Sequence, residues 1–175
     1  MKIGKTAITM ANERALGEKR VLIAGIGNRL MGDDGFGPRV IDLLEGVTLP
    51  SNVDARDFAT AGLTVATELE KYDAVLFLDT INLMENPGEL HVIDISEIGE
   101  IDDAMVEPRA GLHDVGLPGL LRLAQAMGTI PPKVILIGCE PKSIAQSLEL
   151  SEEVGRAAQS AVGMVLNVLS TLVKE

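Results

Sequence analysis

The 175-residue sequence is poor in aromatic residues and in cysteine. It contains no tryptophan, one tyrosine and three phenylalanines, so its core has to be built from Val, Ile, Leu, Ala and Met. The single cysteine, Cys139, excludes an internal disulfide and fits a reducing cytoplasm. No apolar run approaches the ~20 residues that span a membrane, and the first 20 residues lack the apolar segment of a signal peptide. We therefore expect a cytoplasmic protein.

Positive charge is also scarce. The sequence has 15 Lys and Arg against 26 Asp and Glu, which gives a formal net charge of -11. A surface of this sign repels phosphate backbones and anionic lipids, so we exclude nucleic acid and membrane surfaces as partners. The length suits one domain. We expect a single α/β domain over residues 20–175, preceded by a flexible arm or an extra helix over residues 1–19.

The sequence does contain a regular alternation of apolar strands and amphipathic helices. Strands are predicted at residues 21–24, 53–58, 72–78 and 134–138. The residues from 151 to 173 have the apolar period of a long helix with an acidic first turn. Strands that alternate with helices predict a mostly parallel sheet in an α/β sandwich.

The stretch from Val21 to Glu45 contains a strand, a glycine-bearing loop, two acids and a helix. Asp33 and Asp34 lie between the strand and the helix. Ligands of open α/β sheets bind at the carboxyl ends of strands, so this double acid is a candidate site. One of two adjacent acids commonly caps the next helix, and we assign that role to Asp33.

Three polar residues are expected at one edge of the sheet. Asp34 follows the first strand, Asp79 ends the strand at 72–78, and His113 precedes a helix. Two carboxylates and an imidazole suit a borderline divalent metal such as zinc or nickel. The same three groups also suit acid–base work on a peptide carbonyl without a bound metal. Aspartates at strand ends also serve in turns and helix caps, so spacing alone leaves these alternatives open.

Other sites are excluded or assigned a structural role. A dinucleotide fingerprint needs glycine where Leu30 stands, and no Lys-Ser or Lys-Thr pair follows a glycine loop. There is no HExxH helix and no GxSxG elbow. Cys139 ends an apolar strand and is expected to be a small buried hydrophobe rather than a nucleophile. His91 lies in an alternating segment and is expected at the surface.

Five motifs, taken in order, resemble those of one enzyme family. They are GIGNRLMGDDGFGPRVIDLL (25–44), DFATAG (57–62), FLDTI (77–81), GLHDVGLPGLL (111–121) and VILIGCEP (134–141). Together they resemble the hydrogenase maturation endopeptidases, which trim the carboxyl-terminal tail of the large subunit of nickel-iron (NiFe) hydrogenases. The segments GDDGFGP and GCEP are similar to those of the subgroup that acts on coenzyme F420-reducing hydrogenases.

The resemblance implies a fold and a site. The fold is a three-layer α/β sandwich with a twisted, mostly parallel five-stranded sheet, phosphorylase/hydrolase-like, with one antiparallel strand. Residues 90–95 alternate apolar and polar and are our candidate for that strand. The family's nickel-binding residues, which we also expect to be catalytic, correspond to Asp34, Asp79 and His113. Nickel would be carried by the substrate, with zinc or cadmium as a surrogate.

The resemblance further implies how the partner, a hydrogenase large-subunit precursor, is held. We expect Gly27, Asn28, Thr60 and Gly62 to bind this substrate. One departure is Ala59, where the family's loop usually has glycine, and it predicts a constraint on positive φ angles there.

The expected reaction is attack on the peptide bond by a water that the metal or an aspartate activates, with backbone amides of the glycine-bearing loops stabilising the oxyanion. Two alternatives remain open from the sequence. The same three residues would serve a non-catalytic nickel-dependent checkpoint that recruits another factor. The glycine loop would instead serve a nucleotide- or small-molecule-binding α/β domain.

Overall fold

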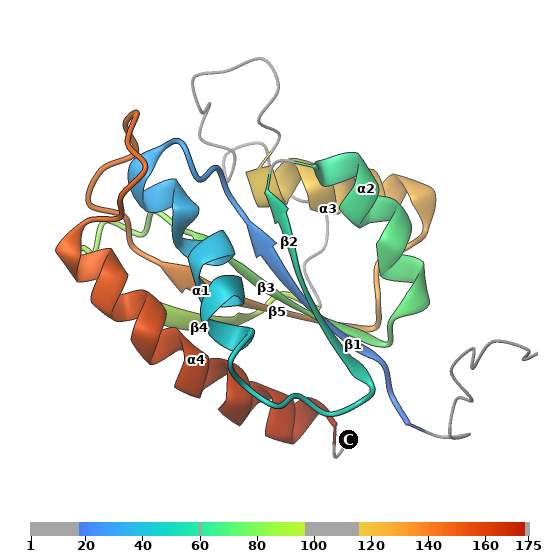
Figure 1. Cartoon of the computed structure of the whole chain (residues 1–175). Coiled ribbons are helices and arrows are strands. Elements are labelled where there is room, and N and C mark those ends of the chain that lie inside the picture. Colours follow the sequence, from blue (N-terminus) through green and yellow to red (C-terminus); the bar gives the residue numbers. More distant parts are fainter. Residues whose placement is uncertain (1–17, 60, 97–115, 174–175) are drawn as a thin grey trace, which may run out of the picture.

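The computed structural model describes residues 18–59, 61–96 and 116–173 (Figure 1). Its strands are β1 (Val21–Ile26), β2 (Val53–Ala59), β3 (Ala74–Thr80), β4 (Leu90–Asp94) and β5 (Lys133–Cys139). Its helices are η1 (Gly32–Gly35), α1 (Phe36–Leu44), α2 (Gly62–Glu68), η2 (Leu69–Lys71), α3 (Gly116–Met127) and α4 (Glu152–Leu172). The arm or extra helix predicted over residues 1–19 lies outside the described residues except for its last two positions.

The five strands form one sheet in the order β2-β1-β3-β5-β4. Neighbouring strands among β1, β2, β3 and β5 pair in parallel, and β4 pairs antiparallel with β5. The mostly parallel five-stranded sheet and the assignment of its antiparallel strand are therefore confirmed. The central strand, β3, is buried along its whole length.

Helices cover both faces of the sheet, as the sequence predicts. In Figure 1, α1 and α4 lie on one face, and α2 and α3 lie on the other. Each face has its own core, built almost wholly from aliphatic side chains. On one side Val40 and Val165 pack with strand residues such as Leu76. On the other side Val65 and Leu120 pack with strand residues such as Phe77. The alternation of strands and helices thus produces the three predicted layers.

The central strand differs from its prediction at both ends. It begins at Ala74 rather than Tyr72 and continues through Asp79 and Thr80. The phenol of Tyr72 donates a hydrogen bond to Asp54 Oδ2 (2.7 Å) before the strand begins. The ladder with β5 persists to the last two residues, so pairing rather than hydrophobicity sets where this strand ends.

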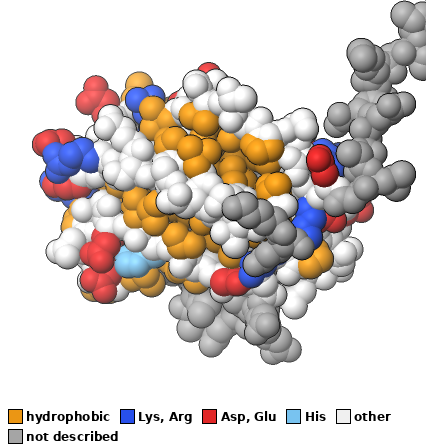
Figure 2. Space-filling view, turned by 90° about the horizontal axis from the view of Figure 1, so that it is seen from below, with side chains coloured by type: hydrophobic (Ala, Val, Ile, Leu, Met, Phe, Trp, Pro, Cys, Tyr) orange, Lys and Arg blue, Asp and Glu red, His pale blue; other side chains and the backbone are white. Residues whose placement is uncertain are grey.

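The side of the molecule along which α4 and β4 run carries a patch of apolar surface (Figure 2). Figure 2 looks at the molecule from below and shows apolar side chains over the middle of that side, with charged side chains around the margin. Val92 of β4 and Leu166 of α4 are both exposed. In the described part of the chain, no helix combines the length and the apolar character that crossing a membrane requires.

Candidate active site

The start of α1 lies very close to the ends of two strands. A Cβ atom on Gly37 would lie 2.2 Å from the carbonyl oxygen of Leu78 and 2.3 Å from that of Ile26, so only glycine fits there. This close approach brings the short helix η1, which precedes α1, to the carboxyl ends of β1 and β3. It explains why an acid in η1 meets residues at the end of β3.

Asp34 lies in η1 and is only 1% exposed. Its Oδ2 atom accepts a hydrogen bond from the backbone N–H of Asn28 (2.8 Å), and its Oδ1 atom accepts one from the Thr80 hydroxyl (3.3 Å). The preceding loop folds tightly over it. Gly27 has a φ of 128°, and a Cβ atom there would lie 1.9 Å from the Asp34 carbonyl oxygen.

Asp79 lies next to the last residue of β3 and is 2% exposed. Its Oδ1 atom accepts a hydrogen bond from the backbone N–H of Thr80 (2.8 Å). Thr80 therefore contacts both aspartates, one through its backbone and one through its hydroxyl. The structure brings Asp34 and Asp79 to one edge of the sheet, and sequence reasoning missed the residue that joins them.

His113 and Thr60 lie outside the described residues. Of the three predicted metal-binding residues, the structure therefore describes only the two carboxylates, Asp34 and Asp79. In the ranges that the structure describes, no group of three or more His, Cys, Asp or Glu side chains is placed to hold a metal ion. Two buried carboxylates supply hard oxygen ligands, which suit a divalent metal once a nitrogen ligand joins them.

The first glycine-bearing loop uses its polar groups to build itself. The side-chain Oδ1 of Asn28 accepts a hydrogen bond from Leu30 N (2.9 Å), and the Asn28 carbonyl accepts one from Met31 N (3.0 Å). The amide of Gly27 donates to Ala59 O (3.1 Å). The amides of Gly27, Leu30 and Met31 thus already donate within the chain, and the expectation that this loop offers amides to an oxyanion stays a prediction. The second glycine-bearing loop ends at Gly62, the first residue of α2.

Ala59 adopts the conformation that its side chain disfavours. Its φ is 48°, in the left-handed region that favours glycine. The register between β1 and β2 shifts here, because Gly25 pairs with Asp57 while Ile26 pairs with Ala59. The Asp57 side chain holds this bulge by accepting a hydrogen bond from Ala59 N (2.8 Å). The departure noted in the sequence thus marks a strained backbone position beside the site.

The prediction that Asp33 caps the following helix is wrong. The N-cap residue of α1 is Gly35, and no side chain caps that helix. Asp33 is 1% exposed and accepts hydrogen bonds from the backbone N–H groups of Lys142 and Ser143 (both 2.9 Å) and of Ser151 (2.6 Å). It therefore ties the loop after β5, and the residue before α4, to η1.

Glu140 is a fourth buried acid at this edge, after Asp33, Asp34 and Asp79, and sequence reasoning assigned it no role. It is 4% exposed and directly follows β5. Its Oε2 atom accepts a hydrogen bond from Leu83 N (2.8 Å), and its carbonyl accepts one from Gly88 N (2.8 Å). Glu140 thus holds the loop that joins β3 to β4. The rule that pointed to Asp34, an acid just past a buried strand, would also have found Glu140.

Cys139 behaves as the sequence predicts. It is fully buried in the core beneath α4. Burial, together with the nearby charges of Asp33 and Glu140, raises the pKa of its thiol to about 12. A thiol that stays protonated at neutral pH is a poor nucleophile, so Cys139 is structural.

His91 is less exposed than predicted. It lies on β4 opposite Gly138, on the same face of the strand as Ile93, which packs against the core beneath α2 and α3. Its Nε2 atom is buried and has no hydrogen-bond partner in the described part of the chain.

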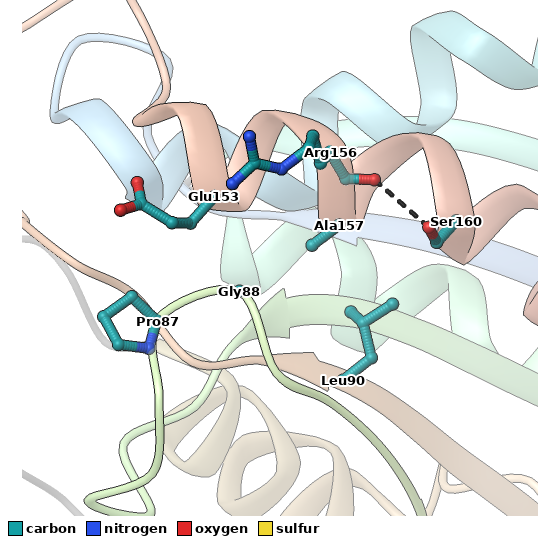
Figure 3. Close-up of a pocket in the computed structure, with 7 residues that line it drawn as sticks. All are labelled: Pro87, Gly88, Leu90, Glu153, Arg156, Ala157 and Ser160. Atoms are coloured by element: carbon teal, nitrogen blue, oxygen red, sulfur yellow. Dashed lines mark hydrogen bonds between the residues drawn. The ribbon is translucent and has the colours of Figure 1, made fainter.

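A shallow cavity of about 330 Å³ lies between α4 and the turn before β4 (Figure 3). It is lined by Pro87, Gly88, Leu90, Glu153, Arg156, Ala157 and Ser160, none of which was predicted to act in the site. Its charged groups are already paired, Glu153 with Lys142 (2.7 Å) and Arg156 with Glu152. We therefore assign the chemistry to the buried aspartates rather than to this cavity.

Known proteins with related sequences and structures define the class. A family model described as hydrogenase maturation protease (HycI) matches residues 38–168. The hydrogenase expression/formation protein HupD of Rhodobacter capsulatus is 31% identical over 158 residues, which are 90% of this chain and 71% of HupD.

Two solved structures share the fold. The hydrogenase 2 maturation peptidase from Thaumarchaeota archaeon SCGC_AB-539-E09 has a TM-score of 0.68 at 55% identity, covering 87% of this chain and 99% of its own. The hydrogenase maturating endopeptidase HybD from Escherichia coli has a TM-score of 0.73 at 27% identity, covering 87% and 93%.

The chain belongs to the hydrogenase maturation protease family. It is therefore an endopeptidase, a hydrolase of peptide bonds that acts in hydrogenase maturation. This membership favours the peptidase over the checkpoint module and the small-molecule-binding domain that the sequence left open.

Proposed function

We propose that this protein removes the carboxyl-terminal extension of a nickel-loaded nickel-iron hydrogenase large-subunit precursor in the cytoplasm. Asp34, Asp79 and His113 meet the nickel that the precursor carries, and they act on the bond to be cut. The single observation that carries the proposal is the pair of buried aspartates joined by Thr80 at one edge of the sheet, in a member of this peptidase family.

The chemistry of these residues supports recognition of a metal that is already bound elsewhere. Carboxylate and imidazole hold nickel modestly compared with thiolate. A site of two aspartates and a histidine is therefore suited to test a loaded precursor and to release the product afterwards. Zinc or cadmium in the precursor would act as a surrogate because both accept the same ligand types.

We assign bond cleavage to a water molecule activated by one of the two aspartates acting as general base. Both are buried, which strengthens electrostatic effects at the site. Since the amides of Gly27 and Asn28 already donate within the protein, we assign oxyanion stabilisation to the second loop, with Thr60 and Gly62.

Substitution of the three residues tests the proposal. Asp34→Asn, Asp79→Asn and His113→Ala should each abolish processing of a nickel-loaded precursor while circular dichroism remains that of the wild type. Asp94→Asn, which alters an exposed acid on β4, should process normally and serves as the control. Processing by all three site variants would refute the assignment.

The purified protein alone also separates a peptidase from a checkpoint module. Incubated with precursor and no other factor, a peptidase yields the shortened large subunit. A checkpoint module binds the precursor and leaves its mass unchanged.

A further inference from the structure

The most exposed apolar side chains of the described structure gather at the edge that carries the aspartates. Met84 is 87% exposed, Leu148 81%, Leu63 65% and Leu30 59%. Each lies in a loop, or in the first turn of a helix, that follows β1, β2, β3 or β5. Because the carboxyl ends of parallel strands share one edge, these side chains surround the site. Apolar surface that a protein leaves in water at such a place marks an interaction surface.

Two of these loops are joined along their length. The amide of Gly32 donates to Ser147 O (2.9 Å), and the amide of Ser147 donates to Leu30 O (3.0 Å). In Figure 1 the loop before η1 and the loop after β5 lie side by side. Leu30, Ile144 and Leu148 are all exposed on these adjoining segments, and we call the three side chains the apolar ridge.

Buried and charged groups fix the backbone beneath the apolar ridge. Asp33 accepts three backbone hydrogen bonds from the loop after β5, as described above. Arg29, next to Leu30, pairs with Asp42 of α1 (2.7 Å) and with Asp57 of β2 (2.9 Å). These bonds raise the pKa of the Arg29 guanidinium, the hydrogen bond to Asp42 most of all. A ridge that is ordered before binding loses little conformational entropy when a partner docks.

The chemistry of the apolar ridge identifies its partner. The chain carries a net charge of -11, yet the cations beside the ridge, Arg29 and Lys142, are both paired with acids of the same chain. The ridge therefore offers apolar contact rather than charge. Its side chains protrude into solvent, whereas small molecules bind in concave pockets. A protruding apolar surface fits a complementary apolar patch on another folded protein.

We propose that the apolar ridge docks the folded body of the hydrogenase large-subunit precursor, next to the tail that the aspartates cleave. This inference rests on the proposed function. Leu30 lies four positions before Asp34 in the same loop and short helix, so a protein seated on the ridge is held beside the site. The ridge touches no reacting atom, so its contacts are equally strong in the ground and transition states. They set KM and leave kcat unchanged.

Steady-state processing of the nickel-loaded precursor from the same organism tests this. The double variant Leu30→Gln/Leu148→Gln should raise KM about tenfold or more, as loss of central apolar contacts does in interfaces, with kcat within about twofold of wild type. A single Leu148→Gln variant should also raise KM. Leu148→Met keeps the apolar contact and should therefore have the KM of the wild type. Leu123→Gln/Leu166→Gln removes exposed leucines from α3 and α4 and is the matched control, with KM unchanged.

Binding of the precursor to immobilised protein gives a second measurement and separates the two proposals. Weaker binding by the ridge variant supports docking even where no cleavage occurs, and in that case only the proposed function fails. If the wild type cleaves the precursor and the ridge variant does so with the same KM, the docking surface is overturned and the proposed function stands. Equal losses in the control variant also overturn it. Sedimentation of the wild type as a dimer that the ridge variant dissociates would assign the ridge to a second copy of the chain and overturn the proposal.

Discussion

At the scale of single residues, Thr80 is the link between the two buried aspartates. Its hydroxyl donates to Asp34, and its backbone N–H donates to Asp79. Thr80→Val keeps the shape of the side chain and removes the hydroxyl, so one oxygen of Asp34 loses a donor. A hydrogen bond to a charged group contributes about 1.5–3 kcal/mol, which corresponds to a ten- to hundredfold fall in kcat/KM.

Thr80→Ser retains the hydroxyl and is the control for that experiment. Thr80→Ser should keep most of the wild-type kcat/KM. It should also keep the wild-type dependence of the reaction on pH, which Thr80→Val should change and which a purely structural role would not move. Equal activity of the valine and serine variants would show that the hydroxyl does not position Asp34.

Ala59 offers a test of backbone strain at the same scale. A non-glycine residue in the left-handed region costs about 1–2 kcal/mol, and glycine offsets part of the gain through its greater freedom in the unfolded chain. Ala59→Gly should therefore raise the free energy of unfolding by about 0.5–1 kcal/mol in urea titrations. Ala55→Gly is the matched control, because Ala55 lies in the same strand and does not have a positive φ. This control variant should not stabilise the protein. If Ala59→Gly lowers the free energy of unfolding, the backbone at Ala59 is not strained.

Which site residues were predictable depends on whether their contacts are local. Asp34 follows one apolar run and Asp79 ends another, so the position of each residue relative to its apolar run was enough to predict it as a site residue. The contact between Thr80 and Asp34 joins residues 46 positions apart and exists because Gly37 lets α1 approach the sheet. No local pattern carries that information. His113 was predicted from its place before a helix and from the family resemblance, and its role stays a prediction.

At the scale of elements, Asp33 joins η1 to the loop after β5 and to the start of α4. Asp33→Asn replaces one acceptor oxygen with a donor, so it cannot keep all three backbone hydrogen bonds. Charge-assisted bonds to buried groups contribute about 1.5–3 kcal/mol each, and we expect the variant to be less stable by about 2–4 kcal/mol. Urea unfolding measures the loss, and limited proteolysis should cut first between residues 140 and 151.

Asp94→Asn is the control for this experiment. Asp94 pairs with Lys133 at the surface, and exposed pairs contribute at most about 1 kcal/mol. If the two variants unfold at the same urea concentration, Asp33 does not hold these elements together.

Element type was predictable because apolar periodicity differs between strands and helices. The predicted start of β3 was wrong by two residues. Tyr72 is apolar enough to extend the apolar run, but its phenol donates a hydrogen bond to Asp54 before the strand begins. The role of Asp33 was wrong for a related reason. A capping residue and a residue that ties two loops together have the same sequence signature, and only the approach of a distant loop separates them.

At the scale of the whole molecule, the parallel sheet gathers the strand ends, the buried acids and the exposed leucines at one edge. The predicted alternation of strands and helices is confirmed, because each element depends on a pattern within its own segment. The single antiparallel strand, which the family resemblance implied and which we assigned to residues 90–95, is confirmed as β4. The edge as a surface was not predictable, since Leu30 and Leu148 are 118 positions apart and meet only through the pairing of their loops.

The most direct test of the central claim is the mass of a large-subunit precursor before and after incubation with the purified protein, with and without nickel in the precursor. We expect the nickel-loaded precursor to lose the mass of its carboxyl-terminal extension, and the nickel-free precursor to keep its full mass. The Asp79→Asn variant should leave both unchanged. Shortening of the nickel-free precursor, or equal shortening by the variant, would contradict nickel-dependent cleavage at this site.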